Sequence, residues 1–293
     1  MDPATEAERP EARPSTEDIK RSVQGFYDSV GWQRSESEVF EDANRYEDLR
    51  RVSAEYVHRT NHRVSRHLAA EGRFLLDVAS GPVQFDDFVA YSRNYRRRVC
   101  VDLSLRALRE ARRRLADHGL YVLADITRLP FRDGCFDGVC SLHTIYHVPA
   151  EEQGRAFEEL HRTLAPSRTA VVVYAWGKYS PLMFLFDALP HKLAALAGPL
   201  FRRGASDRDS QPDLYFHPRS QTWFRSAVAP HMRNDVLVWR SLSNFFLRRW
   251  VPDNALGSAF LRMVYRAEEW WPRALGWLGN YPLIVIRKGG DMS

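Results

Sequence analysis

The sequence predicts an α/β fold built on a doubly wound, mainly parallel sheet. Three short apolar runs follow one another along the chain, and each ends in an aspartate: Asp77, Asp102 and Asp125. The first run, residues 74–78, leads into a turn of small residues, as a strand does when it feeds a nucleotide-binding loop. A carboxylate at the end of the second strand of such a sheet binds ribose hydroxyls. Chance does not readily give three such endings in succession.

The other elements follow from the remaining apolar runs and the stretches between them. Pro282 opens the last run, a position that suits the start of a strand. Longer stretches with mixed apolar and charged residues read as helices at 46–68, 221–229 and 250–278. We expect strands near residues 74–78, 99–102, 120–124, 136–142, 169–175, 235–241 and 282–288.

These motifs resemble those of the class I S-adenosylmethionine (SAM) methyltransferases, in particular the subgroup that methylates small molecules. Their first loop usually reads Asp-Val-Gly-Cys-Gly-Thr-Gly, where this chain has Asp77-Val78-Ala79-Ser80-Gly81-Pro82-Val83. Their Leu-Pro-Phe-x-Asp-x-x-Phe-Asp run corresponds to residues 129–137 here. The resemblance covers about residues 20–176. It implies a Rossmann-like sheet of seven strands with the last strand antiparallel, and SAM as the cofactor.

The resemblance also assigns cofactor contacts. Asp77 would lie close to the methionine ammonium, Asp102 would accept bonds from the ribose hydroxyls, and Asp125 would recognise the adenine amino group. Tyr27 would lie against the sulfonium, whose charge an aromatic ring favours; the alternative is a helix that packs on the sheet through its aromatic residues. The implied cofactor-binding residues are Asp77, Ala79, Gly81, Asp102, Leu103, Asp125, Ile126 and Tyr27.

The first loop departs from the family pattern at two positions. Ala79 replaces the first glycine and Val83 replaces the third. Alanine disfavours positive φ, so we expect the loop to adopt a conformation that L-residues allow. We interpret the loop as compatible with SAM. The substitutions leave open the alternative of a non-catalytic binding module with the same fold.

His143 is the candidate catalytic base. It follows the fourth strand, where the family faces the transferring methyl group, and an imidazole that titrates near neutrality can deprotonate an acceptor hydroxyl. The alternative is a histidine that only hydrogen-bonds its loop. Tyr146 and His147 on the same loop, and His217 further along, are weaker candidates.

We expect no metal. His58 and His62 are four residues apart on a predicted helix, and His143 and His147 repeat that spacing. Neither pair has an acidic or cysteine third ligand nearby at a recognisable spacing. The three cysteines form no Cys-x-x-Cys pair, which is typical of a reduced, cytoplasmic compartment.

Composition agrees with one globular enzyme domain. The 293 residues are 44% hydrophobic and 27% charged, with a formal net charge of +5. The run Arg96-Arg97-Arg98 is expected on a solvated face, and the Asn- or Asp-Pro-Pro-Tyr/Phe motif of base-amine methylation does not follow strand four. We therefore expect no nucleic-acid partner. Residues 1–18 are expected to form a disordered tail, followed by a single domain at 19–290 with its core at 70–176.

Two insertions are expected to form a helical cap over the acceptor, at 177–234 after strand five and at 244–280 between strands six and seven. Their aromatic and aliphatic residues favour a small-molecule acceptor that is apolar, methylated on oxygen or else nitrogen, such as a secondary metabolite or a sugar-containing intermediate. Charged residues interrupt the apolar stretch 181–200, which excludes a simple membrane span. The alternatives are peripheral membrane contact with a lipid-linked acceptor, or a cap with only its own small core. The oligomeric state stays open.

Overall fold

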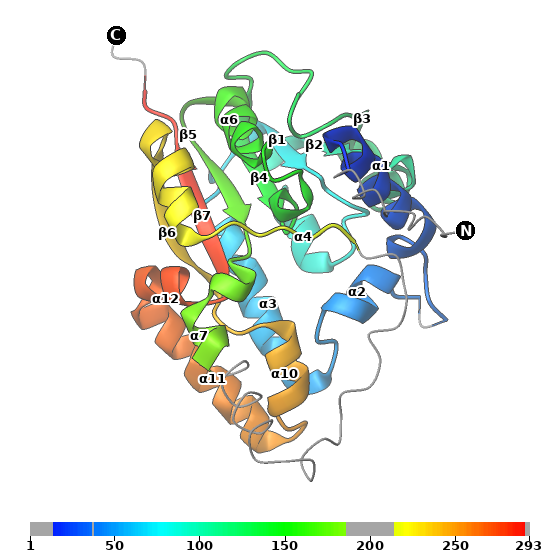
Figure 1. Cartoon of the computed structure of the whole chain (residues 1–293). Helices are drawn as coiled ribbons and strands as arrows, with labels where there is room; N and C mark the ends of the chain where they lie inside the picture. Colours follow the sequence, from blue (N-terminus) through cyan, green and yellow to red (C-terminus); the bar gives the residue numbers. More distant parts are fainter. Residues whose placement is uncertain (1–13, 37, 186–213, 291–293) are drawn as a thin grey trace, which may run out of the picture.

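The computed structural model describes residues 14–36, 38–185 and 214–290 (Figure 1). At its centre lies a seven-stranded sheet in the order β3-β2-β1-β4-β5-β7-β6. β7 is antiparallel to both of its neighbours, β5 and β6, and the other pairs are parallel. The predicted Rossmann-like fold is therefore confirmed. The strands are β1 (Gly72–Val78), β2 (Tyr95–Asp102), β3 (Gly119–Leu123), β4 (Phe136–Leu142), β5 (Leu164–Val173), β6 (Arg233–Arg240) and β7 (Tyr281–Arg287).

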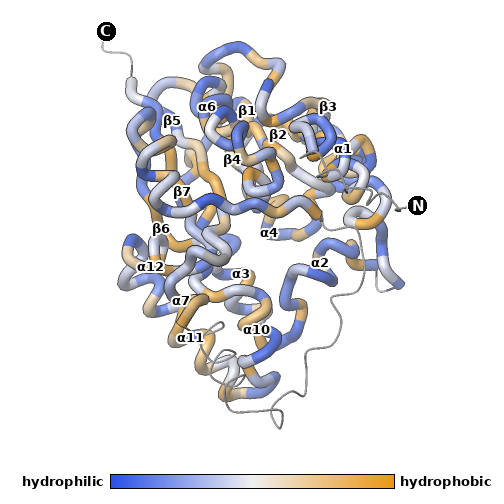
Figure 2. Tube along the Cα trace, viewed as in Figure 1, coloured by the Kyte–Doolittle hydropathy of each residue, from blue (hydrophilic) through white to orange (hydrophobic). Residues whose placement is uncertain are grey.

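The two faces of the sheet are both covered, which explains why its central strands are continuous apolar runs. Successive side chains of a strand point to opposite faces. Leu76 accordingly packs with α6 (Gln153–Thr163) and with residues 224–228, whereas Leu75 packs with the end of α3 (Arg51–Ser65). Both leucines are fully buried. Figure 2 shows the hydrophobic residues along the strands of the sheet.

The N-terminal segment folds across the carboxyl ends of the strands. It comprises α1 (Thr16–Phe26), a π-helical turn at Tyr27–Gly31, and α2 (Glu41–Tyr46). The predicted disordered tail of residues 1–18 ends too late, because α1 begins at Thr16. Ser15 and Asp18 form a capping box there, in which each side chain bonds the backbone N–H of the other residue. Residues 1–13 lie outside the described part of the chain.

The remaining helices flank the sheet and extend below it in Figure 1. The predicted helix at 250–278 is divided, and the one at 221–229 continues after one turn as a π-helical segment at Phe224–Val228. The expected loop at 202–213 and most of the apolar stretch 181–200 lie outside the described residues. The helices that flank the sheet or extend below it, besides α3 and α6, are α4 (Asp86–Ala90), α5 (Leu105–Leu115), α7 (Pro181–Met183), α9 (Gln221–Trp223), α10 (Asn244–Trp250), α11 (Ala255–Trp270) and α12 (Pro272–Leu278).

The helices of the two insertions have a small core of their own. Met183 of α7, Leu247 of α10 and Leu261 of α11 pack there with Val52 and Tyr56 of α3. Within the described residues, the structure contains no helix that is long and apolar enough to span a membrane. The helices of the two insertions thus pack on α3 as well as on the sheet.

Candidate active site

A cavity of about 610 Å³ opens at the carboxyl ends of β1, β2 and β4, where α/β folds bind ligands. α1, α2, the loop after β4 and the N-terminal part of α10 complete its walls. The structure brings together in this cavity His143 and every cofactor-binding residue that the sequence analysis named, although the roles of those residues stay predictions. They are Tyr27, Asp77, Ala79, Gly81, Asp102, Leu103, Asp125, Ile126 and His143.

The loop after β1 keeps a glycine-type backbone in spite of its substitutions. Ala79, Gly81 and Val83 have φ angles of 55°, 55° and 54°. These φ values fall in the narrow left-handed range that L-residues allow, although alanine and valine disfavour it. Val83 is fully buried against Leu108 of α5, and the Gly81 N–H donates to Asp102, so surrounding contacts hold the loop in place. The left-handed conformation costs about 1–2 kcal/mol for each L-residue.

Asp102 is held at the end of β2 by two backbone donors. The N–H groups of Gly81 and Ser104 donate to its two oxygens at 2.9 and 2.8 Å. Burial raises the pKa of Asp102 to about 6, although these hydrogen bonds oppose the shift. Each oxygen keeps a further lone pair. The carboxylate can therefore accept hydrogen bonds from a diol such as ribose.

Asp125 is bridged to the N-terminal helix by a lysine that the sequence reasoning missed. Lys20 of α1 places its Nζ 2.7 Å from Asp125 and 2.6 Å from Glu152. Although burial acts to raise it, the pKa of Asp125 is lowered by Lys20 and by the N–H and hydroxyl of Thr127. Lys20 thus ties α1 to the expected adenine end of the cavity. A single lysine far from any motif gave no signal in the sequence.

Asp77 lies in a buried ion pair with Arg98 of β2. The Arg98 Nε is 3.0 Å from the Asp77 carboxylate, and the Cys140 thiol donates to the other oxygen at 3.3 Å. Burial acts to lower the pKa of Arg98, but the charge of Asp77 raises it overall. The expectation of a solvated Arg96-Arg97-Arg98 run is wrong at Arg98, which is 1% exposed within a strand. Arg98 therefore balances the negative charge of Asp77 beside the cavity.

Two aromatic residues cover the glycine loop. The rings of Tyr27 and Trp32 are stacked, with centroids 4.8 Å apart. A Cβ at Gly81 would lie only 3.1 Å from the Trp32 ring, so a larger residue there would require that ring to shift by a few tenths of an ångström. Tyr27 lines the cavity, and its contact with a sulfonium stays a prediction.

His143 lies at the end of β4 with a φ of 58°. Burial, reinforced by the charge of Arg240, lowers its pKa to about 3. Its ring contacts Trp239 and Tyr281, with centroid distances of 4.4 and 5.5 Å. A neutral imidazole with so low a pKa is a weak base near pH 7. The base role of His143 stays a prediction, and the pKa favours a hydrogen-bonding role.

The other candidate bases divide between the cavity and the surface. His147 lines the cavity, and its Nδ1 donates to the carbonyl of Tyr215 at 2.7 Å. Burial lowers its pKa to about 4. Tyr146 also lines the cavity, whereas His217 is exposed and is not among the cavity residues.

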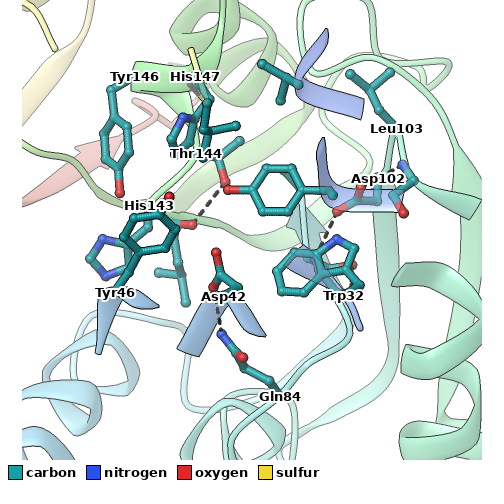
Figure 3. A pocket seen from close by; sticks show the side chains of 18 of the residues that line it. Trp32, Asp42, Tyr46, Gln84, Asp102, Leu103, His143, Thr144, Tyr146 and His147 are labelled. Atoms are coloured by element: carbon teal, nitrogen blue, oxygen red, sulfur yellow. Dashed lines mark hydrogen bonds between the residues drawn. The ribbon is translucent and has the colours of Figure 1, made fainter. Parts of the chain in front are cut away.

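Asp42 of α2 is the titratable group that the sequence reasoning missed. Figure 3 shows its carboxyl group in the cavity between the side chains of His143 and Trp32. Burial raises its pKa to about 7, the charge of Glu47 adds to the effect, and the Gln84 amide, which donates at 3.4 Å, opposes it. A group with this pKa can both accept and release a proton near neutrality. No motif surrounds Asp42, so only the fold reveals its place.

Three cavity side chains have buried polar atoms without a partner among the described residues: Trp32 Nε1, Gln84 Oε1 and His143 Nε2. Such atoms are rare unless a ligand or water satisfies them. Together with the free lone pairs of Asp102 and the small residues around Gly81, they fit an adenosine-containing cofactor. The arrangement supplies donors, acceptors and, at Asp42, a carboxyl group whose pKa burial raises to about 7.

Comparisons with known proteins agree with this geometry. Residues 76–172 match the family model described as a methyltransferase domain. The ubiquinone/menaquinone biosynthesis C-methyltransferase UbiE of Azotobacter vinelandii is 28% identical over 203 residues, which cover 64% of this chain and 78% of that protein.

Two solved structures share the fold over most of the chain. The DhpI-SAM-HEP complex has a TM-score of 0.54 at 14% identity, over 94% of this chain and 100% of that one. Phosphoethanolamine N-methyltransferase 1 of Haemonchus contortus, solved with phosphoethanolamine and S-adenosylhomocysteine, has a TM-score of 0.55 at 12% identity. That alignment covers 96% of this chain and 51% of the solved one.

Proposed function

This chain is a class I SAM-dependent methyltransferase, and we propose that it methylates a carbon atom of a small molecule, next to a phenolic or enolic hydroxyl. The observation that carries the deprotonation of a hydroxyl is the carboxyl group of Asp42, which lines the cavity and whose pKa burial raises to about 7. The name of the Azotobacter vinelandii relative, a C-methyltransferase of quinone biosynthesis, supports carbon as the methylated atom.

The cofactor's place is proposed from the residues around the cavity. Asp102 would accept the ribose hydroxyls, and Asp125 with Lys20 would face the adenine. The backbone at Ala79 and Gly81 would lie against the methionine part. When bound, SAM supplies a methyl carbon whose bond to sulfur breaks as the acceptor attacks. The protein therefore needs mainly to align the acceptor and to remove its proton.

Asp42 is the proposed base. Its carboxylate takes the proton of the acceptor hydroxyl, and the electron pair left on oxygen is shared with the adjacent ring or enol carbon. That carbon forms the new bond to the methyl carbon and then loses its own hydrogen as a proton to water, which restores the ring. A base with a pKa near the working pH is best suited to the first step.

Oxygen, which the sequence analysis favoured, is the competing acceptor atom. The same deprotonation creates an oxyanion, which can itself take the methyl group. The charges in the cavity do not distinguish methylation on carbon from methylation on oxygen, because Asp42 would remove the hydroxyl proton in both reactions. The position of the methyl group in the product separates them.

A lipid-linked acceptor is a second candidate, favoured by the surface beside the cavity mouth. Phe245 of α10 lines the cavity and is 56% exposed. Hydrophobic residues continue along the neighbouring α11 (Figure 2), and some of them are exposed. Arg248 and Arg249 flank this surface with positive charge, as in helices that rest on anionic membranes. The exposed apolar residues are Phe245, Leu256, Met263, Trp270 and Trp271.

Product analysis with the full chain tests the proposal. Methyl-deuterated SAM is supplied with a hydroquinone that has a free ring carbon beside its hydroxyl, and with the dimethyl ether of the same compound as a control. We expect deuterated methyl on carbon for the hydroquinone alone, and a rate about 10²–10⁴-fold lower for Asp42→Asn. Label on oxygen would refute carbon methylation, and labelling of the ether would refute the hydroxyl requirement.

Sedimentation with vesicles separates the lipid-linked candidate. If the acceptor is carried in a membrane, the chain should bind vesicles that contain phosphatidylglycerol, and Trp270→Ser with Trp271→Ser should weaken that binding. This candidate would be excluded if the chain does not bind the vesicles and the double tryptophan variant methylates a water-soluble acceptor as fast as the natural chain does.

A further inference from the structure

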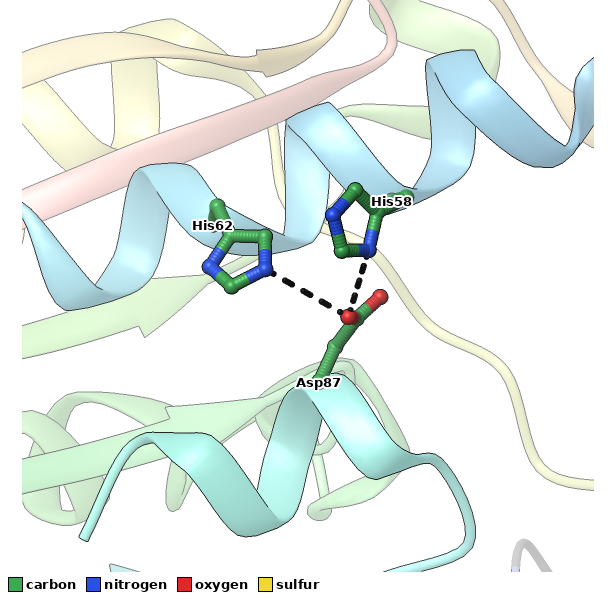
Figure 4. A group of neighbouring side chains, drawn as sticks. All are labelled: His58, His62 and Asp87. Atoms are coloured by element: carbon green, nitrogen blue, oxygen red, sulfur yellow. Dashed lines mark hydrogen bonds and ion pairs between the residues drawn. The ribbon is translucent and has the colours of Figure 1, made fainter. Parts of the chain in front are cut away.

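Two histidines and an aspartate meet on the outside of the molecule, and none of the three is among the residues that line the cavity. His58 and His62 lie one turn apart on α3, and Asp87 faces them from α4 (Figure 4). The His58 Nδ1 is 2.7 Å, and the His62 Nε2 3.5 Å, from the same Asp87 oxygen. One ligand atom from each residue lies within 4.8 Å of those of the other two.

From this geometry, we propose that His58, His62 and Asp87 form a binding site for a divalent transition-metal ion, with Zn²⁺ as the first candidate. Zinc bonds to imidazole nitrogen and carboxylate oxygen are about 2.0–2.2 Å long, so ligand atoms around a tetrahedral ion are about 3.3 Å apart. The separations of 2.7 and 3.5 Å bracket that value. Imidazole donors favour zinc and its neighbours over Mg²⁺ and Ca²⁺, which prefer oxygen.

Exposure allows an ion to enter and leaves its fourth position to water. The side chains of His58 and His62 are 58% and 40% exposed, whereas that of Asp87 is 17% exposed. Asp86, the acidic neighbour of Asp87, pairs instead with Arg114. Arg59, beside His58, pairs with Glu55 at 2.7 Å. The nearby arginine charges are thus compensated, and the site carries the single negative charge of Asp87.

An outer partner already orients the carboxylate. The Asn61 amide donates to the second oxygen of Asp87 at 3.0 Å, and the carbonyl of Asn61 accepts from Tyr91. Asn61 is buried, so this support is rigid. Partners of this kind fix the direction of a ligand and strengthen metal binding.

The ion would join two elements next to the cofactor cavity. α4 follows the loop after β1, and its neighbouring residues Phe85 and Phe88 line the cavity. A metal bridge from α3 would therefore restrain this wall. The sequence analysis expected no metal because it sought the third ligand close to the histidine pair in sequence, whereas Asp87 comes from another helix.

Metal titration of the full chain tests the proposal. The chain, first treated with a chelator, is titrated with Zn²⁺ and Mg²⁺ by calorimetry and with Co²⁺ by visible absorption. We expect one Zn²⁺ per chain, a Co²⁺ spectrum of low coordination number, a higher melting temperature with Zn²⁺, and no response to Mg²⁺. His62→Ala should lose at least about 10-fold in Zn²⁺ affinity, and Asn61→Ala about 10-fold.

His231→Ala is the matched control, because His231 is an exposed histidine outside the cluster. It should bind Zn²⁺ as the natural chain does. The proposal is overturned if the natural chain shows no saturable one-to-one binding, or if His62→Ala binds Zn²⁺ as tightly as His231→Ala. His58→Gln and Asp87→Asn, which keep the side-chain size, serve if His62→Ala does not fold.

Discussion

Replacement of Asp42 by asparagine should stabilise the protein at neutral and alkaline pH. The pKa of Asp42 is raised by burial from 3.8 to about 7 in the folded protein. The folded chain therefore binds this proton more tightly than the unfolded chain does. Stability from the protonated group is fully present below pH 3.8 and is lost as the pH rises through about 7. The asparagine amide cannot ionise, so the variant avoids this loss.

The size of the effect follows from the shift. Three pKa units at about 1.4 kcal/mol each correspond to about 4 kcal/mol. Because Asp42 lines a cavity that water can enter, we discount this to about 2–4 kcal/mol at pH 8. About two of the three units lie between pH 5 and pH 7, so the advantage of the variant should grow by about 1–3 kcal/mol over that interval.

Urea unfolding at pH 5 and pH 8 measures this difference, without cofactor. Glu41→Gln, in the same helix and beside Arg45, is the control and should change the free energy of unfolding by no more than about 0.5 kcal/mol at either pH. An advantage of Asp42→Asn that is equal at both pH values would refute the reasoning, as would a loss of stability at pH 8.

Three further substitutions test the loop, the buried pair and the candidate base. Ala79→Gly should raise the free energy of unfolding by about 1 kcal/mol, because glycine adopts positive φ without the cost that alanine incurs. The control Ala54→Gly, at an exposed helical position, should lower it by about as much. Denaturant unfolding in which both variants change the free energy of unfolding in the same direction would contradict this. Arg98→Met should lower the free energy of unfolding by about 3–5 kcal/mol, because it leaves Asp77 buried and unpaired. In thermal and urea unfolding, the double variant with Asp77→Leu should recover most of that loss. An Arg98→Met variant as stable as the natural chain would disprove the pairing. His143→Ala should lower turnover more than SAM affinity in steady-state and binding assays, because the unpartnered His143 Nε2 in the cavity can hydrogen-bond the acceptor. Unchanged turnover would remove this residue from the chemistry.

The sheet was predictable because its strands are buried on both faces and leave apolar runs that end in aspartates. Asp77, Asp102 and Asp125 mark three strand ends in the sequence, and the structure gathers them at one cavity. The antiparallel last strand came from the family resemblance rather than from any local signal. Periodicity cannot show the direction of a strand.

The missed features depend on partners that are distant in sequence. Arg98 is a charged residue within a strand, and its burial is made tolerable by the carboxylate of Asp77 and the carbonyl of Phe88. Asp42 and Lys20 enter the cavity because the N-terminal helices fold across the sheet. Ala79 adopts positive φ because tertiary contacts of the loop outweigh the small free-energy cost of that conformation for alanine. Local sequence carries none of these long-range terms.

Calorimetric titration of the purified chain with SAM and with S-adenosylhomocysteine tests the central claim most directly. The account predicts one site per chain with a dissociation constant in the micromolar range. Asp102→Ala should weaken binding by at least about 10-fold, because hydrogen bonds to a charged group contribute about 1.5–3 kcal/mol. Thermal unfolding shows whether that variant remains folded, and Asp102→Asn replaces it if not. No detectable binding by the natural chain, or full affinity in a folded Asp102 variant, would contradict the account.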